Sequence, residues 1–169
     1  MKKYENKLQK DFEKYKSGLD NKIYITKAKF DAEFDLYRNL SSSFFRAVKA
    51  VTIMIPSGLA TYPADKEDRE KYENELYDKA RNATVMAQDM LCCNAAFIPK
   101  ELYEKYDEIM RLCRIQVSVF EDRWNVMMTP DEREHFSHED FERSRDISTK
   151  FEKLNDKLRN YLSKLDILE

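Results

Sequence analysis

The residues best suited to chemistry are a glutamate and two histidines near position 135. Glu132 and His135 form a Glu-x-x-His pair, and on a helix this spacing places both side chains on one face. Ferritin-like di-iron bundles use two such pairs together with two further inward-facing carboxylates. This chain has one pair, and the second histidine, His138, follows three residues later. The alternative interpretation is a surface helix in which Glu132 completes a capping box begun by Thr129 and Pro130.

A metal-dependent bundle enzyme would therefore need carboxylates that the sequence does not identify. Other reaction types lack their motifs as well. The two glycines, Gly18 and Gly58, are too far apart to build a phosphate-binding loop, and there is no Gly-x-Ser-x-Gly nucleophile elbow. We therefore predict that the protein is not an enzyme and has no catalytic residue and no cofactor. A weak metal site at Glu132, His135 and His138 is the alternative.

The three cysteines, Cys92, Cys93 and Cys113, do not have the spacing of a zinc site or of a disulfide framework. Two of them are adjacent, and disulfide geometry does not easily bridge neighbours. An odd number of cysteines favours a reducing compartment. We expect them to fill small gaps near helix ends, where cysteine behaves as a small hydrophobic residue.

The charge of the chain is balanced overall but unevenly distributed. The net charge is −2, which gives no reason to expect a nucleic-acid partner. Residues 1–30 hold nine lysines against four acidic residues, whereas residues 31–169 hold 21 basic and 28 acidic residues. A basic arm on an acidic body could meet an anionic surface such as lipid headgroups. The alternative is a solvated helix whose lysines keep it soluble.

Long stretches without glycine or proline, rich in Glu, Lys, Leu and Ala, predict an all-α protein. We predict an antiparallel four-helix bundle over residues 26–169, preceded by a basic amphipathic helical arm or stalk over residues 1–25. Gly18 and the β-branched run Ile23–Thr26 indicate a break between the arm and the bundle, with Thr26 as the next N-cap. No internal sequence repeat is expected.

Apolar residues at steps of three and four mark one face of each predicted helix. In the arm they are Leu8, Phe12, Tyr15 and Leu19. In the bundle they are Phe30, Phe34, Tyr37, Phe44, Val48, Val51 and Ile55; Tyr72, Leu76, Ala80, Ala83, Ala87 and Met90 or Leu91; Leu102, Tyr106, Ile109, Cys113, Val117, Phe120 and Trp124; and Ile147, Phe151, Leu154, Leu158, Tyr161, Leu165 and Leu168.

Capping residues separate these segments. Asp65 occupies an N-cap position, Pro99 suits a first helical residue, and Ser137 with Asp140 repeats the capping pattern before the last helix. The segment IPSGLATYP at 55–63 is the most distinctive loop. Its Leu59 and Tyr62 would either bind a partner, as loop residues often do, or fold back onto the end of the bundle.

The apolar stripes also indicate which residues could form contacts between helices. In an up-down-up-down bundle the arm leaves beside the C-terminus, so Leu165 and Leu168 could pack against it. No apolar run approaches the ~18 residues of a membrane helix, and the lysine-rich start does not have the form of a signal peptide. We therefore expect the cytoplasm, or the cytoplasmic face of a membrane, as the location.

Several segments resemble a group of uncharacterised bacterial helical proteins, and the resemblance spans most of residues 20–169. They are KAKFDAEFDLYRNLSSSFF at 27–45, IMIPSG at 53–58, YPADKE at 62–67, NAAFIP at 94–99 and VFEDRWN at 119–125. In that group a similar domain often follows an N-terminal hydrophobic segment and a charged helical stalk. No activity or catalytic residue can be carried over from this resemblance, because none is established for the group.

This sequence departs from the group because no hydrophobic segment precedes its lysine-rich arm. Either it is a soluble member, or it begins inside a longer protein. In the second case the arm would be a juxtamembrane stalk, and its lysines would suit a cytoplasmic membrane surface.

The leading hypothesis is a non-enzymatic helical interaction or scaffold domain. Its partner would be another protein or a second copy of the chain, met through Leu8, Phe12, Tyr15 and Leu19 of the arm. A peripheral membrane module, with the arm on anionic lipid, is a further alternative.

Overall fold

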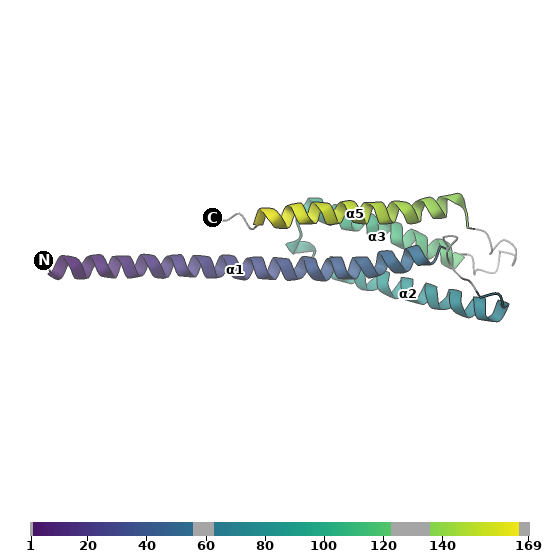
Figure 1. The fold of residues 1–169 in the computed structure, drawn as a ribbon, viewed down its shortest axis with the longest axis horizontal. Helices are drawn as coiled ribbons and strands as arrows, with labels where there is room; N and C mark the ends of the chain where they lie inside the picture. The colour runs from purple at the N-terminus through teal and green to yellow at the C-terminus, as the bar shows by residue number, and fades with distance from the viewer. Residues whose placement is uncertain (1, 56–62, 123–135, 166–169) are drawn as a thin grey trace. The chain divides into compact units, whose positions relative to one another are not determined.

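The computed structural model describes residues 2–55, 63–122 and 136–165, with side chains described from position 9 onward except at 25 and 165. In these ranges the chain is helical, without a strand. The elements are α1 (Lys2–Ile53), α2 (Lys66–Cys93), the 3-10 helix η1 (Ala95–Phe97), α3 (Lys100–Asp122) and α5 (His138–Leu165) (Figure 1). The all-α prediction is confirmed.

The chain divides into two compact units, Met1–Tyr37 and Arg38–Glu169. We call the described part of the first unit the arm and the second unit the bundle. The sequence placed the end of the arm earlier, between residues 25 and 26, and both positions lie within α1.

The predicted break between the arm and the next helix is wrong. α1 continues without interruption through Gly18 and the run Ile23–Thr26, so Thr26 is not an N-cap. The reason is that a single glycine costs a helix only about 1 kcal/mol relative to alanine, and β-branched residues cost less. Lysine, leucine, alanine and glutamate around them favour the helix, and α1 contains no proline.

The bundle consists of the C-terminal part of α1 with α2, α3 and α5, and successive helices run in opposite directions (Figure 1). Each of the four stripes predicted for the bundle supplies side chains to the core. Its buried residues include Phe44, Val48, Val51, Leu76, Ala80, Ala87, Leu102, Tyr106, Ile109, Ile147, Leu154 and Leu158. The rings of Phe44 and Tyr106 meet edge to face, with centroids 4.6 Å apart, so α1 and α3 contact directly. The predicted antiparallel four-helix bundle is confirmed.

Helix ends follow the predicted capping chemistry. The Asp65 carboxylate accepts hydrogen bonds from the backbone N–H groups of Glu67 and Asp68, at 2.9 and 3.2 Å. At the start of α5, the Ser137 hydroxyl accepts from the Asp140 N–H, and Asp140 accepts from the Ser137 N–H in return. Pro99 directly precedes α3 rather than opening it, and its carbonyl accepts from the Tyr103 N–H at 3.0 Å.

None of the helices in the described ranges has an apolar stretch long enough to cross a bilayer. The predicted core residue Trp124 lies outside the described residues.

Candidate functional site

The arm presents an apolar stripe to solvent. Phe12, Tyr15 and Leu19 belong to the described part of α1, and 66%, 72% and 47% of their surface is exposed. Ile23 continues the same spacing and is 59% exposed. The predicted stripe did not include Ile23, because its β-branched side chain was interpreted as a helix breaker. Its spacing of four residues from Leu19 could have identified it as part of the stripe.

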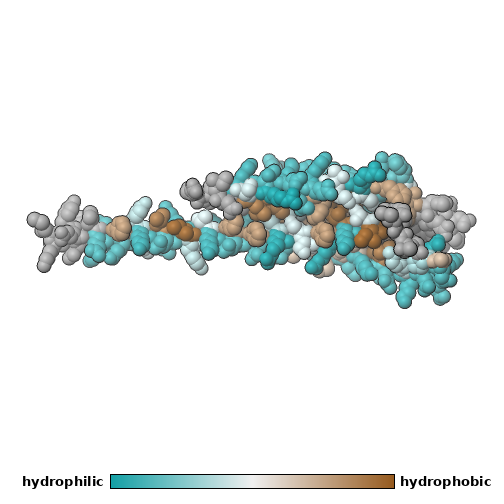
Figure 2. All heavy atoms as spheres, in the orientation of Figure 1, coloured by the Kyte–Doolittle hydropathy of each residue, from teal (hydrophilic) through white to brown (hydrophobic). Residues whose placement is uncertain are grey.

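Further along the arm, Phe34 is 45% exposed and Phe30 is half-buried, and their rings stack with centroids 6.2 Å apart. Charged and other polar residues occupy most of the rest of the arm surface, where Tyr24 is also exposed. Figure 2 shows apolar patches spaced along this helix with hydrophilic side chains around them. Unpartnered apolar side chains in a row on a helix are typical of a surface that binds another helix.

Several predicted interaction residues cannot be placed. Leu8 lies in α1 and Leu165 ends α5, but the side chains of both lie outside the described part of the structure. Leu59, Tyr62 and Leu168 also lie outside the described residues. The proposed packing of Leu165 and Leu168 on the arm therefore stays a prediction, as does the binding role of the 55–63 loop.

The predicted metal candidates are only partly described. Glu132 and His135 lie outside the described residues. His138 is exposed in the first turn of α5, and its Nε2 lies 3.3 Å from a carboxylate oxygen of Glu142. Across the described ranges, no three metal-ligating side chains come together. His138 thus takes part in a surface contact within its own helix.

The cysteines are free thiols. Cys92 and Cys93 are exposed at the end of α2, whereas Cys113 is buried in α3. Burial raises the pKa of the Cys113 thiol to about 12, which keeps it protonated and unreactive. The expectation of a small hydrophobic role fits Cys113, and exposure contradicts it for Cys92 and Cys93. They follow Leu91, which takes the core-facing position in the last turn of α2 and is 1% exposed.

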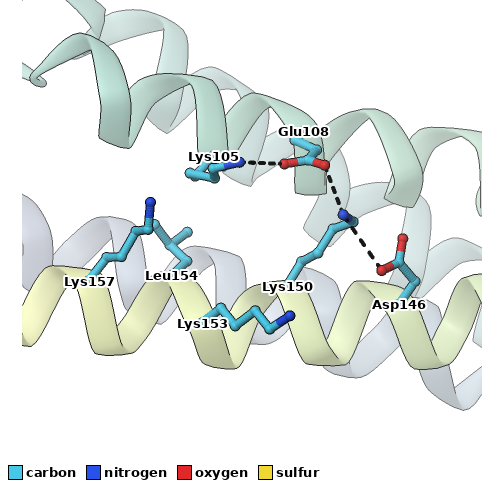
Figure 3. A pocket seen from close by; sticks show the side chains of 7 residues that line it. All are labelled: Lys105, Glu108, Asp146, Lys150, Lys153, Leu154 and Lys157. Carbon is cyan, nitrogen blue, oxygen red and sulfur yellow. Dashed lines mark hydrogen bonds and ion pairs between the residues drawn. The ribbon is translucent and has the colours of Figure 1, made fainter.

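A basic groove runs between α3 and α5 (Figure 3). Glu108 of α3 accepts hydrogen bonds from Lys105, at 3.2 Å, and from Lys150 of α5, at 2.8 Å. Asp146 lies 3.6 Å from the same Lys150 ammonium group. Lys153 and Lys157 line the remainder of this groove of about 280 Å³. The sequence missed it because its two sides are far apart along the chain.

The ion pairs of this groove shift the pKa values of Glu108 and Lys150. Hydrogen bonds from Lys150 and then Lys105 hold the pKa of Glu108 below its usual range. The hydrogen bond to Glu108 likewise raises the pKa of Lys150. Glu108 and Lys150 therefore both stay charged at neutral pH. Their ion pair joins α3 to α5.

A second polar cluster connects α3 to the start of α5. Gln116 is fully buried, and its Oε1 accepts a hydrogen bond from Arg143 at 2.8 Å. Its Nε2 donates to the Asp140 carbonyl at 3.3 Å. Arg143 also donates to the Asp140 carboxylate at 3.0 Å. Each polar group of this cluster has a partner, so the arrangement fixes the α3–α5 register rather than offering a binding site.

A second hollow, of about 480 Å³, lies between α1 and α2 within the bundle. Its walls are mainly short polar side chains, with two methionines at one side: Asn39, Ser42, Ser43, Arg46, Lys79, Asn82, Ala83, Met86 and Met90. It contains no cluster of acid, base and nucleophile. The arm stripe is thus the surface whose chemistry most clearly calls for a partner.

Comparison with models of protein families, with curated proteins and with solved structures finds no match to this chain.

Proposed function

We propose that this protein is a non-enzymatic helical interaction module whose arm assembles with a second copy of the chain. The observation that carries the proposal is the exposed apolar stripe of Phe12, Tyr15, Leu19 and Ile23. Monomeric proteins do expose single apolar side chains, but a regular row on one helix face is a different case. We further propose a reducing, cytoplasmic setting, which suits the exposed thiols of Cys92 and Cys93.

The energetics favour a reversible assembly. Burying a large apolar side chain completely is worth about 1.5–3 kcal/mol, so half-exposed stripe residues on two copies could together contribute roughly 10 kcal/mol. Association costs about 4–15 kcal/mol in lost freedom of motion. The two quantities are of similar size. The degree of assembly should therefore depend on protein concentration.

The experiment is absolute mass by light scattering across a range of concentrations of the full chain. The wild-type protein is compared with a Phe12→Asp, Leu19→Asp double variant. The expected result is a concentration-dependent dimer for wild type and a monomer for the double variant, because two carboxylates would have to be buried in the contact.

A matched control separates apolar contact from charge. Ser17→Asp with Asn21→Asp adds the same two carboxylates to exposed positions on the opposite face of the arm. This control should still assemble. A monomeric wild-type chain at every concentration, or equal loss in both variants, would refute the proposal.

Salt distinguishes a second copy from an anionic membrane as the occupant. Residues 1–30 carry a net charge of +5, so two arms repel each other and added salt should strengthen their association. Binding of the same lysines to phosphatidylserine vesicles should weaken with salt. Vesicle binding that falls with salt, in a chain that stays monomeric, would replace self-association with the membrane alternative.

A further inference from the structure

Because α1 is continuous, an eleven-residue repeat becomes visible in the arm. The break predicted at Ile23–Thr26 had divided this repeat between two separate helices, so neither helix showed the repeat by itself. Apolar or aromatic residues recur at three positions of the repeat, with Thr26 as the one polar exception. The three sets are Leu8, Leu19 and Phe30; Phe12, Ile23 and Phe34; and Tyr15, Thr26 and Tyr37. Tyr37, where the repeat ends, is 1% exposed, so the open part of the stripe ends before it.

An eleven-residue repeat corresponds to about 3.67 residues per turn, close to the natural α-helix, so the stripe stays on one face along the arm. The three positions span roughly 65° around the helix at that spacing. A lipid-facing or core-facing helix presents an apolar face of at least ~100°, whereas a narrower stripe is typical of a coiled-coil seam. The arm therefore has the form of a seam between two helices.

We propose that the occupant of this seam is the arm of a second copy, parallel and in register, in a pair with right-handed or negligible supercoiling. This proposal rests on the proposed function and specifies its geometry. In register, each apolar position meets its own counterpart, so that Phe12 meets Phe12 and Ile23 meets Ile23 of the second copy.

The charges beside the seam select the parallel arrangement. One flank carries Lys16 and Lys27, with Glu5 at its start, and the other carries Asp11, Lys22 and Glu33. In a parallel pair each flank faces the opposite flank of the second copy, whereas in an antiparallel pair it faces its own kind. An antiparallel pair would therefore bring the basic flanks together along the arm.

The parallel pair instead places each basic flank against a flank with two acids. Asp11 then lies beside Lys16 of the second copy, which is attractive. Lys22 lies beside Lys27 of the second copy, which is the one repulsive pairing among these. This charge pattern predicts that a substitution at Lys22 can strengthen the association of the two arms.

The test of orientation is thiol cross-linking in the full chain. Cys92→Ser and Cys93→Ser remove the exposed thiols, and Cys113 is retained because its burial keeps it unreactive. Phe12→Cys and Phe34→Cys are introduced into separate chains, one of them ¹⁵N-labelled, and the mixture is oxidised gently. Intact mass then reports which positions were joined.

A parallel pair joins position 12 to position 12 and yields few or no 12-to-34 links. Predominant 12-to-34 links would overturn the parallel arrangement while leaving self-association in place. A monomer by light scattering, with no links of either kind, would overturn both proposals. A mass above that of two copies would overturn the pairwise arrangement.

The charge pattern has its own test. Lys22→Glu converts the repulsive pairing with Lys27 of the second copy into an attractive one, twice per dimer, and should tighten self-association by roughly five- to tenfold. Lys14→Glu makes the same change in net charge at an exposed position away from the seam. Equal tightening in both variants would overturn the flank assignment, since only general repulsion would then be at work.

Discussion

The arm and helix α5 carry apolar stripes with nearly the same spacing, yet one is exposed and the other is buried. Phe12 and Tyr15 of the arm are 66% and 72% exposed, whereas Ile147 and Leu154 of α5 are 0% and 1% exposed. The difference lies in the surroundings, because α5 has α3 beside it within the same compact unit. The spacing of apolar residues thus predicts which side of a helix is apolar. Whether that side is buried depends on the helices that pack beside it.

The two regions also differ in the polar groups beside the stripe. Lys150 of α5 reaches across to Glu108 of α3 at 2.8 Å, and Arg143 reaches Gln116 at 2.8 Å. Lysines of the arm such as Lys16 and Lys22 are exposed. The α3–α5 contact is therefore fixed in register by polar groups, and the arm offers charges that a second copy could use in the same way.

The largest effect should come from truncating one leucine in each region. Leu154→Ala leaves a cavity in the core and should lower the free energy of unfolding by about 2–5 kcal/mol. Leu19→Ala, in protein dilute enough to be monomeric, should change it by less than about 0.5 kcal/mol, because its side chain is already half-exposed. Urea unfolding followed by circular dichroism measures both. A loss for Leu19→Ala as large as that for Leu154→Ala would mean that the arm stripe is covered within its own chain.

A smaller effect is expected from the polar cluster at the start of α5. Burial of Asp140 raises its pKa, but hydrogen bonds from Ser137 and Arg143 outweigh this, and the pKa lies below its ordinary value. Asp140→Asn removes the charge beside Arg143 and should cost about 1–3 kcal/mol at neutral pH.

The lowered pKa of Asp140 also predicts how the free energy of unfolding changes with pH. A carboxylate whose pKa is lowered by folding stabilises the protein above its ordinary pKa of about 3.9, and the contribution is lost as pH falls through the lower, folded pKa. Unfolding of Asp140→Asn should therefore change less between pH 7 and pH 2 than that of wild type. Asp156→Asn is the control, because Asp156 pairs with Arg159 at an exposed position. Parallel pH profiles for wild type and Asp140→Asn would contradict the assignment.

In the arm, replacing the one glycine should give a modest gain. Gly18 lies inside α1 with no atom near enough to obstruct an added Cβ, and its φ is not positive. Gly18→Ala should stabilise the helix by about 0.5–1 kcal/mol. Helicity at 222 nm during heating, and amide hydrogen exchange over residues 10–26, measure the gain. A loss of helicity instead would show that the arm bends at this glycine.

Much of this architecture could be predicted from the sequence. Apolar spacing identified the core faces, and capping residues such as Asp65 and Ser137 marked where helices begin, because both depend on local chemistry. The missed continuity of α1 has a physical reason as well. Glycine and β-branched residues only lower helix propensity. Whether the flanking residues offset that cost cannot be read from these residues alone.

The candidate sites were harder to predict for a different reason. Glu108 and Lys150 belong to helices that pack together only after the chain folds, so no local pattern joins them. Ile23 had the right spacing, but the expected break hid it. Sequence spacing indicated that Phe12, Tyr15 and Leu19 share a face, whereas only the structure shows that this face is exposed.

The smallest effect is expected where α3 and α5 exchange charges. The side chains of Glu108 and Lys150 are each 30% exposed, so solvent screens their attraction. Glu108→Gln should cost about 0.2–1 kcal/mol, and less at high salt. Because folding lowers the pKa of Glu108, this contribution is present above its ordinary pKa and lost as pH falls through the folded pKa.

A double-mutant cycle with Lys150→Gln isolates the pair from the other contacts of each residue. A coupling energy that shrinks as salt is added would show that the charge pair contributes to holding α3 against α5. A coupling of zero at low salt would mean that apolar packing and the Gln116 cluster suffice.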